Sequence, residues 1–137
     1  MDVVLQSFAA GFPGLMLHLL VTLAMLAGGV VLYTITTPHK DFALVREGNL
    51  AAAISLAGAI LGLAIPLAFC MASSVSVAEI VIWGVLAVFV QILVFRLSDL
   101  LLRDLSSRIE SGEMAAAVLL AGIKLSVAAV NAAAISG

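Results

Sequence analysis

Four long apolar runs, separated by short charged stretches, limit what this chain can fold into. The runs cover residues 14–35, 50–72, 77–95 and 114–135. A helix of about 20 apolar residues, rising about 1.5 Å per residue, crosses the hydrocarbon layer of a bilayer. Within lipid, a single segment satisfies its own backbone hydrogen bonds only as a helix. The sequence therefore predicts an all-α fold: a bundle of four transmembrane helices in one integral membrane domain over residues 1–137.

Composition excludes a soluble domain and a nucleic-acid-binding protein. Hydrophobic residues make up 64% of the chain and charged residues 10%, whereas about a quarter of an average soluble domain is charged. A water-soluble fold of this size could not bury so much apolar surface. The six basic residues are dispersed and the net charge is −2, so the basic patch that nucleic acid requires is missing. We therefore expect the lipid bilayer, and no nucleic acid, as a partner.

The distribution of basic residues indicates the orientation in the membrane. Five of the six lie between the first and second runs or between the third and fourth, namely Lys40, Arg46, Arg96, Arg103 and Arg108. Because positive residues favour the cytoplasmic side, we expect both segments there and both termini outside the cytoplasm. The acidic start of the chain lacks the positive region of a signal peptide. The first run is therefore expected to remain as a membrane helix.

Both segments between the spans carry helix signals. Segment 96–110 has an aliphatic residue at every fourth position and two oppositely charged pairs at the same spacing, which predicts an amphipathic continuation of the third span until residues 111–112. The aliphatic positions are Leu97, Leu101, Leu105 and Ile109, and the pairs are Asp99 with Arg103 and Asp104 with Arg108. In the other segment, Thr37 and Pro38 are typical of an N-cap followed by proline at the first helical position. A short helix through Val45 is expected there.

An internal repeat relates the two halves of the chain. Residues 48–58 and 112–122 are identical at seven of eleven positions, 64 residues apart. Because one period contains two spans, both halves would have the same orientation. We therefore predict two parallel-repeat helical hairpins, over about residues 14–72 and 77–136. Chance similarity between alanine-rich segments is the alternative.

Small residues within the repeat indicate where helices should pack. Gly58 and Gly62 are four residues apart in the second span, and Gly122 and Ser126 stand at the equivalent positions in the fourth. Small side chains let helix backbones approach closely, which favours association in lipid. We expect the second and fourth spans to form the packed centre of the bundle.

The same segments carry a family resemblance. With Thr37–Pro38, Gly58, Gly62, Ala115 and Asn131–Ala132, the chain resembles the YjfL-like family of small bacterial inner-membrane proteins, catalogued as a domain of unknown function. The signature positions are Gly48, Asn49, Ala51, Ala52, Ala53 and Gly112. The resemblance implies four membrane helices, a location in the bacterial inner membrane and no recognised enzymatic activity. It also suggests a cytoplasmic partner among membrane-stress proteins of the phage-shock type. The chain departs from the family pattern at Glu113, where a second asparagine is expected.

Lys124 is the most unusual residue of the spans. A charged side chain at the centre of a bilayer costs about 2.5–3.5 kcal/mol on insertion scales. Lys124 lies eleven residues after Glu113, which is about 16 Å along a helix and close to the midplane. Its side chain could snorkel towards the cytoplasmic end, near Gln91. Alternatively, it could line a polar cavity that attracts an anion or anionic lipid, or form an ion pair between subunits.

Other polar residues of the spans complete the candidate site. Asn131 shares the small-residue face of Lys124, and His18 and Glu79 fall near the extracytoplasmic ends of their spans, where they could meet Asn131. The candidate intramembrane polar site therefore comprises Lys124, Asn131, Gln91 and His18. Tyr33 and Trp83 are expected either in interfacial aromatic belts or in packed helix faces.

Two classes of function remain open. The sequence offers no nucleophile–base pair, paired carboxylates, phosphate-binding loop or metal-ligand cluster. We therefore expect no catalytic residues, metal or cofactor. Cys70 is expected to be a small core residue.

The first function is a membrane scaffold or envelope-stress component that forms a homo-oligomer and presents its cytoplasmic segments to a partner or to headgroups. The second is an oligomeric channel or transporter-like protein for a small ion or solute, lined by Lys124 and Asn131.

Overall fold

The computed structural model describes residues 2–36 and 41–136, and within these ranges the chain forms six helices. They are α1 (Asp2–Thr36), α2 (Asp41–Arg46), α3 (Leu50–Ser73), α4 (Val77–Leu101), α5 (Arg103–Glu110) and α6 (Met114–Ser136). Four of them, α1, α3, α4 and α6, are long and apolar enough to cross a membrane. The predicted all-α fold with four spanning helices is confirmed.

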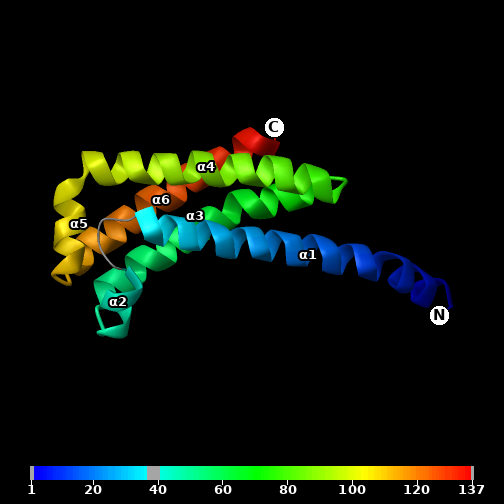
Figure 1. Cartoon of the computed structure of the whole chain (residues 1–137), viewed down its shortest axis with the longest axis horizontal. Coiled ribbons are helices and arrows are strands. Elements are labelled where there is room, and N and C mark those ends of the chain that lie inside the picture. Colours follow the sequence, from blue (N-terminus) through cyan, green and yellow to red (C-terminus); the bar gives the residue numbers. More distant parts are fainter. Residues whose placement is uncertain (1, 37–40, 137) are drawn as a thin grey trace.

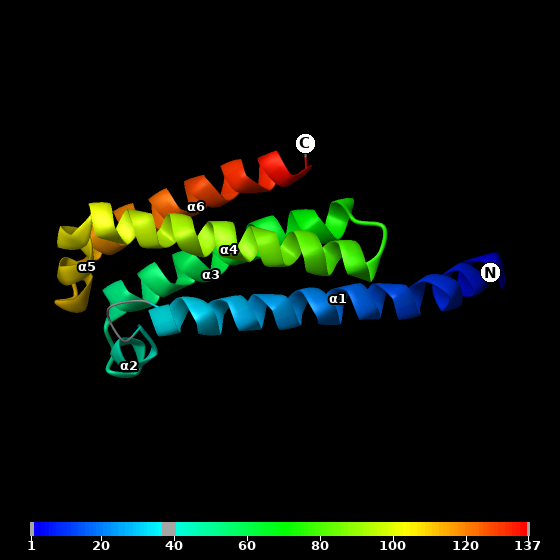
Figure 2. The same cartoon turned by 45° about the horizontal axis from the view of Figure 1, so that its top comes forward.

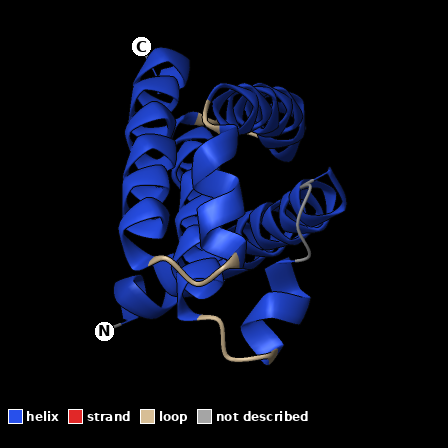
Figure 3. Ribbon diagram, turned by 90° about the vertical axis from the view of Figure 1, so that its left-hand side faces the viewer, coloured by secondary structure: helices blue, strands red, loops and turns tan. Residues whose placement is uncertain are grey.

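The four long helices form a bundle with α3 at its centre. α3 contacts α1, α4 and α6, and it is the most buried of the four. The short helices α2 and α5 lie at the same end of the bundle (Figures 1 and 2), which we call the loop end. Figure 3 views the bundle from this end. The predicted short helix before the second span corresponds to α2, while Thr37 and Pro38 lie outside the described residues.

α1 is longer than predicted. It begins at Asp2 rather than at residue 14, and Pro13 lies inside it. A proline in a helix removes one backbone hydrogen bond, a loss that membrane helices tolerate. The 35 residues of α1 extend about 52 Å at 1.5 Å each, well beyond the roughly 30 Å of the hydrocarbon layer. Its N-terminal part accordingly projects past the other three long helices (Figures 1 and 2).

The predicted continuation of the third span is only partly correct. α4 runs past residue 95 to Leu101, but the backbone turns at Leu102 (φ −119°, ψ 44°) and α5 begins as a separate helix. α5 runs across the loop end (Figure 1) and buries Leu105 and Ile109 against alanines of α3 and α6. The amphipathic segment therefore extends α4 only as far as Leu101, because Leu105 and Ile109 pack on the bundle itself.

The most extensive helix contact joins α3 to α6. A Cβ atom added to Gly58 would lie 2.6 Å from the Ala121 Cβ, far inside ordinary contact distance. A Cβ added to Gly62 would lie 2.6 Å from the Phe95 ring and 3.5 Å from the Lys124 carbonyl oxygen. These glycines therefore let α3 approach both α6 and α4.

The structure does not place Gly122 and Ser126 in this contact. Both residues are exposed, and a Cβ added to Gly122 would meet nothing within 4 Å. α6 instead turns Ala117, Ala121 and Ala128 inwards, all of them buried. Residues one position apart on a helix point about 100° apart, so the same spacing that brings Ala121 to α3 carries Gly122 away from it.

The junctions that lead into α3 and α6 share one backbone geometry. Gly48 and Gly112 both have φ of +89°, a conformation that favours glycine. In each junction the glycine N–H bonds to the carbonyl three residues earlier, and the next N–H bonds to the carbonyl five residues before it. The bonds are Gly48 to Val45, Asn49 to Leu44, Gly112 to Ile109 and Glu113 to Arg108. This arrangement is a Schellman helix end. Duplication of the complete hairpins stays a prediction.

Candidate intramembrane polar site

Lys124 is buried where α6 meets α1 and α4. Its side chain is 1% exposed, and its Nζ donates a hydrogen bond to the Tyr33 hydroxyl and lies 3.6 Å from the Asp99 Oδ1. Nζ also lies 4.8 Å from the centroid of the Tyr33 ring and 5.3 Å from that of Phe95. Aromatic faces attract a cation at these distances. Lys124 is therefore held by partners within its own chain.

The Asp99 carboxylate joins two cations. Its Oδ2 accepts a hydrogen bond from the Arg96 guanidinium, while its Oδ1 faces Lys124. The same guanidinium donates to the carbonyl oxygen of Thr36 at the end of α1. Asp41 of α2 is buried and attracts Lys124 electrostatically. We call Lys124, Asp99, Arg96, Asp41 and Tyr33 the charge network.

The formal charges of this network cancel. The network contains two cations and two carboxylates, and both carboxylates and Lys124 are almost completely buried. Burying a charge is costly unless an opposite charge and hydrogen bonds compensate. The balance explains how Lys124 is accommodated inside the bundle. An ion pair was one of the three settings expected for Lys124, but here the partner is a carboxylate of the same subunit.

Helix direction explains why these residues meet. Asp99 lies one helical turn after Arg96 near the end of α4, and Tyr33 lies in the last turn of α1. α6 begins at the loop end, and side chains on a helix lean towards its N-terminus. The long side chain of Lys124 therefore extends towards the loop end, where α1 and α4 finish.

A second polar contact lies deeper in the bundle. The Asn131 Nδ2 donates to the Gln91 Oε1 at 2.9 Å, between α6 and α4. Gln91 precedes Asp99 by eight residues in α4, which is about 12 Å of helix. Gln91 is fully buried, and its Nε2 has no hydrogen-bond partner among the described residues.

The four residues predicted for the polar site are thus divided. Gln91 and Asn131 contact each other, Lys124 belongs to the charge network, and His18 lies on α1, where no polar contact of its ring to either group occurs among the described residues. The expected meeting of His18, Glu79 and Asn131 does not form. Glu79 instead accepts a hydrogen bond from the Val75 N–H at the start of α4. Three separate helices, α1, α4 and α6, carry these groups, and sequence spacing within one helix does not determine how neighbouring helices are rotated.

Sequence reasoning missed the partners of Lys124. Asp99 was paired with Arg103, but the turn at Leu102 separates them, and Asp99 bonds to Arg96 instead. The available signal was the i, i+3 spacing of Arg96 and Asp99 at the end of an apolar run that continues to Leu101. Of the two predicted surface pairs, Asp104 with Arg108 is present, at 3.5 Å.

The two large aromatic residues occupy different settings. Tyr33 is 1% exposed, within the core that joins α1, α3 and α4. Trp83 is 50% exposed on the outer side of α4. Tyr33 therefore belongs to a packed helix face.

Asn49 has a separate role at the loop end. Its Oδ1 accepts the Ala52 N–H at 3.1 Å, which caps the start of α3. Its Nδ2 donates to the carbonyl oxygens of Ile109 and Glu110 at 3.2 and 3.1 Å. One amide thus bonds to groups at the start of one helix and at the end of another, positions where backbone groups have no partner within their own helix. At the equivalent position, Glu113 forms an ion pair with Arg108 at 3.4 Å.

The remaining signature residues support this junction. Ala51 and Ala52 are fully buried and pack with Leu105 and Ile109 of α5.

In the ranges 2–36 and 41–136, no three His, Cys, Asp or Glu side chains are grouped as metal ligands would be.

Comparison with known proteins agrees with a membrane location. A family model described as Domain of Unknown Function (DUF350) matches residues 7–135. The UPF0719 inner membrane protein YjfL of Escherichia coli strain K12 is 30% identical over 116 residues, which cover 85% of this chain and 88% of the relative, and the protein of the same name from Escherichia coli O157:H7 gives the same values. No solved structure matches the chain. Because the family model and the relatives both cover most of its length, the chain belongs to the DUF350 family.

Proposed function

We propose that the protein is a bacterial inner-membrane scaffold, which associates with copies of itself and offers the surface of α2 and α5 to a membrane-stress partner. The observation that carries this proposal is the way the loop end is fastened. Asn49 joins α3 to α5, and Arg96 joins the end of α4 to the end of α1. A surface held in place before binding loses less conformational freedom when a partner docks. The names of the relatives support the inner-membrane location.

The charges of the loop end support a cytoplasmic docking surface. Arg46, Arg103 and Arg108 are exposed there, and positive residues favour the cytoplasmic side of a membrane. The apolar face of α5 is already occupied by the bundle. The exposed, charged side of α5 is therefore the side available to bind a polar partner.

The neutral charge network favours a scaffold over a path for ions. A translocated anion must be able to reach the cation that attracts it, whereas Lys124 is 1% exposed and its Nζ already lies 3.6 Å from the Asp99 Oδ1. Its balanced setting suits a structural role, in which the network holds α1, α4 and α6 together at the loop end.

The outer face of α6 supports self-association. Gly122 and Ser126 lie in a shallow hollow on this face, bordered by Val118 and Val127. Small residues on a lipid-facing helix allow a second helix to approach closely. A second copy of the chain packed on this face would cover them.

Site-specific photocrosslinking in native membranes tests the scaffold proposal. A photoreactive residue at Arg103, exposed on α5, is expected to capture a second protein in addition to the chain itself. The same residue at Phe8, exposed near the far end of α1, is the matched control and should not capture that protein. Recovery of only the chain itself from both positions would count against a docking surface at the loop end.

Cysteine crosslinking tests self-association separately. Ser126→Cys is expected to give disulfide-linked dimers in membranes, because it lies on the proposed contact face. Val81→Cys, 40% exposed on α4, is the control, and the native Cys70 is buried. Equal dimer yields from the two variants would contradict a specific α6 contact.

The second candidate is an oligomeric channel or transporter-like protein. It is favoured by the two polar layers between α4 and α6, because the deeper layer holds a buried Gln91 Nε2 without a hydrogen-bond partner among the described residues. Polar groups at membrane depth commonly mark ion or proton pathways. Ion flux into vesicles containing the wild type or Lys124→Ala decides this candidate, with Asn131→Ala as a milder second variant. Equal leakage from all three proteins would eliminate it.

A further inference from the structure

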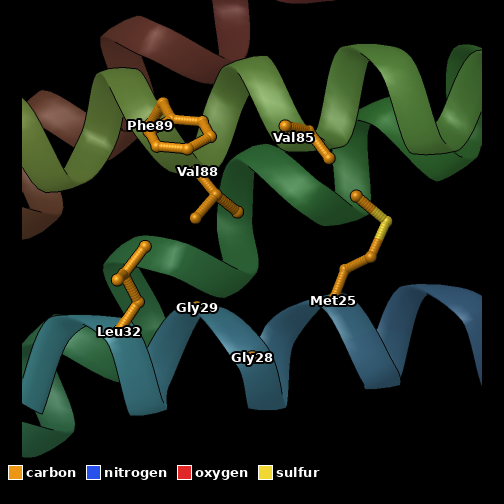
Figure 4. Close-up of a pocket in the computed structure, with 7 residues that line it drawn as sticks. All are labelled: Met25, Gly28, Gly29, Leu32, Val85, Val88 and Phe89. Carbon is orange, nitrogen blue, oxygen red and sulfur yellow. The ribbon is translucent and has the colours of Figure 1, made fainter.

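An apolar groove runs along the outside of the bundle between α1 and α4 (Figure 4). α1 contributes Met25, Gly28 and Leu32, α4 contributes Val85 and Phe89, and α3 lies behind them in the view. The hollow has a volume of about 170 Å³. An engineered apolar cavity of about 150 Å³ binds benzene, so the groove has room for a segment of a hydrocarbon chain.

Two adjacent glycines create this groove. Gly29 faces Val88, whose nearest methyl would lie 3.3 Å from an added Cβ, so α1 and α4 are close at this level. Gly28 is turned outwards, and an added Cβ there would meet nothing within 4 Å. The missing side chain of Gly28 therefore leaves the hollow open to the surroundings.

Arg96 lies beyond the groove towards the loop end, on the same helix as Val85 and Phe89. Its guanidinium reaches across to the carbonyl oxygen of Thr36, one helical turn beyond Leu32 on α1. The Arg96 side chain is 23% exposed, although its Nε is buried and has no hydrogen-bond partner among the described residues. Along α4, Arg96 is about 10 Å from Phe89 and about 16 Å from Val85 at 1.5 Å per residue.

These positions match the dimensions of one leaflet. The hydrocarbon half of a bilayer is about 15 Å deep. Counting from Val77, the first 20 residues of α4 reach Arg96, and a helix of about that length crosses the hydrocarbon layer. Arg96 therefore lies at headgroup level, with the groove beneath it in the same leaflet.

We propose that Arg96 and the groove form a binding site for an anionic phospholipid of the leaflet at the loop end. One acyl chain lies in the groove, and the phosphate lies beside the Arg96 guanidinium. A second helix, about 10 Å across, is too wide to enter a hollow of this size, whereas an extended acyl chain fits. Asp99 does not repel the phosphate decisively, because it faces Lys124 as well as Arg96.

Native mass spectrometry of the purified full chain tests this site. The protein in detergent is titrated with phosphatidylglycerol and with phosphatidylcholine of identical acyl chains. We expect one tightly bound lipid per chain, with phosphatidylglycerol favoured about fivefold, the contribution typical of one interfacial cation. Millimolar inorganic phosphate should leave the lipid bound, because phosphate has no acyl chain. Displacement by phosphate would indicate a simple anion site and overturn the proposal.

Two variants separate the headgroup from the chain. Arg96→Gln is expected to lose the preference for phosphatidylglycerol, whereas Arg46→Gln, which removes an exposed charge from the same end, should keep it. Gly28→Leu fills the groove and is expected to weaken binding of both lipids. Gly14→Leu is its control on the same helix, since an added side chain there also meets nothing within 4 Å.

Several results would overturn the lipid site. They are equal binding of the two lipids to the wild type, unchanged binding by Gly28→Leu, and equal effects of Arg46→Gln and Arg96→Gln. A change of oligomeric state in Gly28→Leu without a change in lipid binding would assign the groove to a second copy of the chain. If Arg96→Gln fails to fold, Gly28→Leu and its control still decide the question.

Discussion

The balance of the charge network predicts a specific pattern of stability in variants of Asp99 and Lys124. Removing one partner of a buried ion pair leaves the other charge uncompensated, which costs about 3–5 kcal/mol. Asp99 is 6% and Lys124 1% exposed, so solvent screens them little. Because Arg96 and Asp41 remain to share the imbalance, we expect the lower end of that range, about 3 kcal/mol, for Asp99→Asn. Lys124→Met should destabilise the protein by a comparable amount, because it leaves a negative instead of a positive charge uncompensated.

The double variant distinguishes charge balance from simple loss of contacts. Asp99→Asn with Lys124→Met removes one charge of each sign, so its cost should not exceed that of either single variant. The free energy of unfolding in mixed dodecylmaltoside and SDS micelles, followed by the fluorescence of the single Trp83, measures all three. Arg108→Gln is the control, because its ion pair with Asp104 is exposed and such pairs contribute up to about 1 kcal/mol. A loss below about 1 kcal/mol for Asp99→Asn, or additive losses in the double variant, would refute the reasoning.

Three further predictions concern the junction, the helix contact and the orientation. Asn49→Ala should destabilise the protein by about 1 kcal/mol or more, because it removes a helix cap and two bonds to α5. Asn49→Asp should keep the cap but increase hydrogen exchange at the end of α5, and unchanged exchange would contradict the bridging role. Gly58→Leu should disrupt the bundle and lower the yield of folded protein on size exclusion, whereas Gly122→Leu should be tolerated; equal behaviour would contradict the described rotation of α6. A cysteine at Arg103 in a Cys70→Ala background should react with impermeant maleimide only in inverted vesicles, and labelling in intact cells would reverse the proposed orientation.

The Asn49 bridge gives a physical meaning to part of the family signature. Gly48 supplies a positive φ, Asn49 supplies both an acceptor and two donors, and the small Ala51 and Ala52 let α5 pack closely. Glu113 at the equivalent position forms a surface ion pair instead. The two junctions therefore share a backbone geometry but differ in which helices their side chains connect.

The number and identity of the spanning helices could be predicted from the sequence alone. Lipid as a solvent demands long apolar helices, so composition along the chain was sufficient for the spans. The ends were less predictable. The first apolar run begins at residue 14, whereas α1 begins at Asp2. Leu102 interrupts a pattern that predicted one continuous helix. At the start of α1, helical hydrogen bonding continues through Pro13. At Leu102, the packing of α5 on the bundle ends α4.

Only the tertiary structure decided which polar groups meet. The spacing along α6 placed Lys124 and Asn131 on one face, yet the tilt of the lysine side chain and the rotation of α1 and α4 sent them to different partners, Asp99 and Gln91. The rotation of α6 about its own axis put Ala121 rather than Gly122 against α3. Spacing within a helix follows from the chain itself, because 3.6 residues make each turn. Rotation and depth of one helix relative to another depend on the packing of residues far apart in the sequence, and this is why the charge network could not be derived from the sequence.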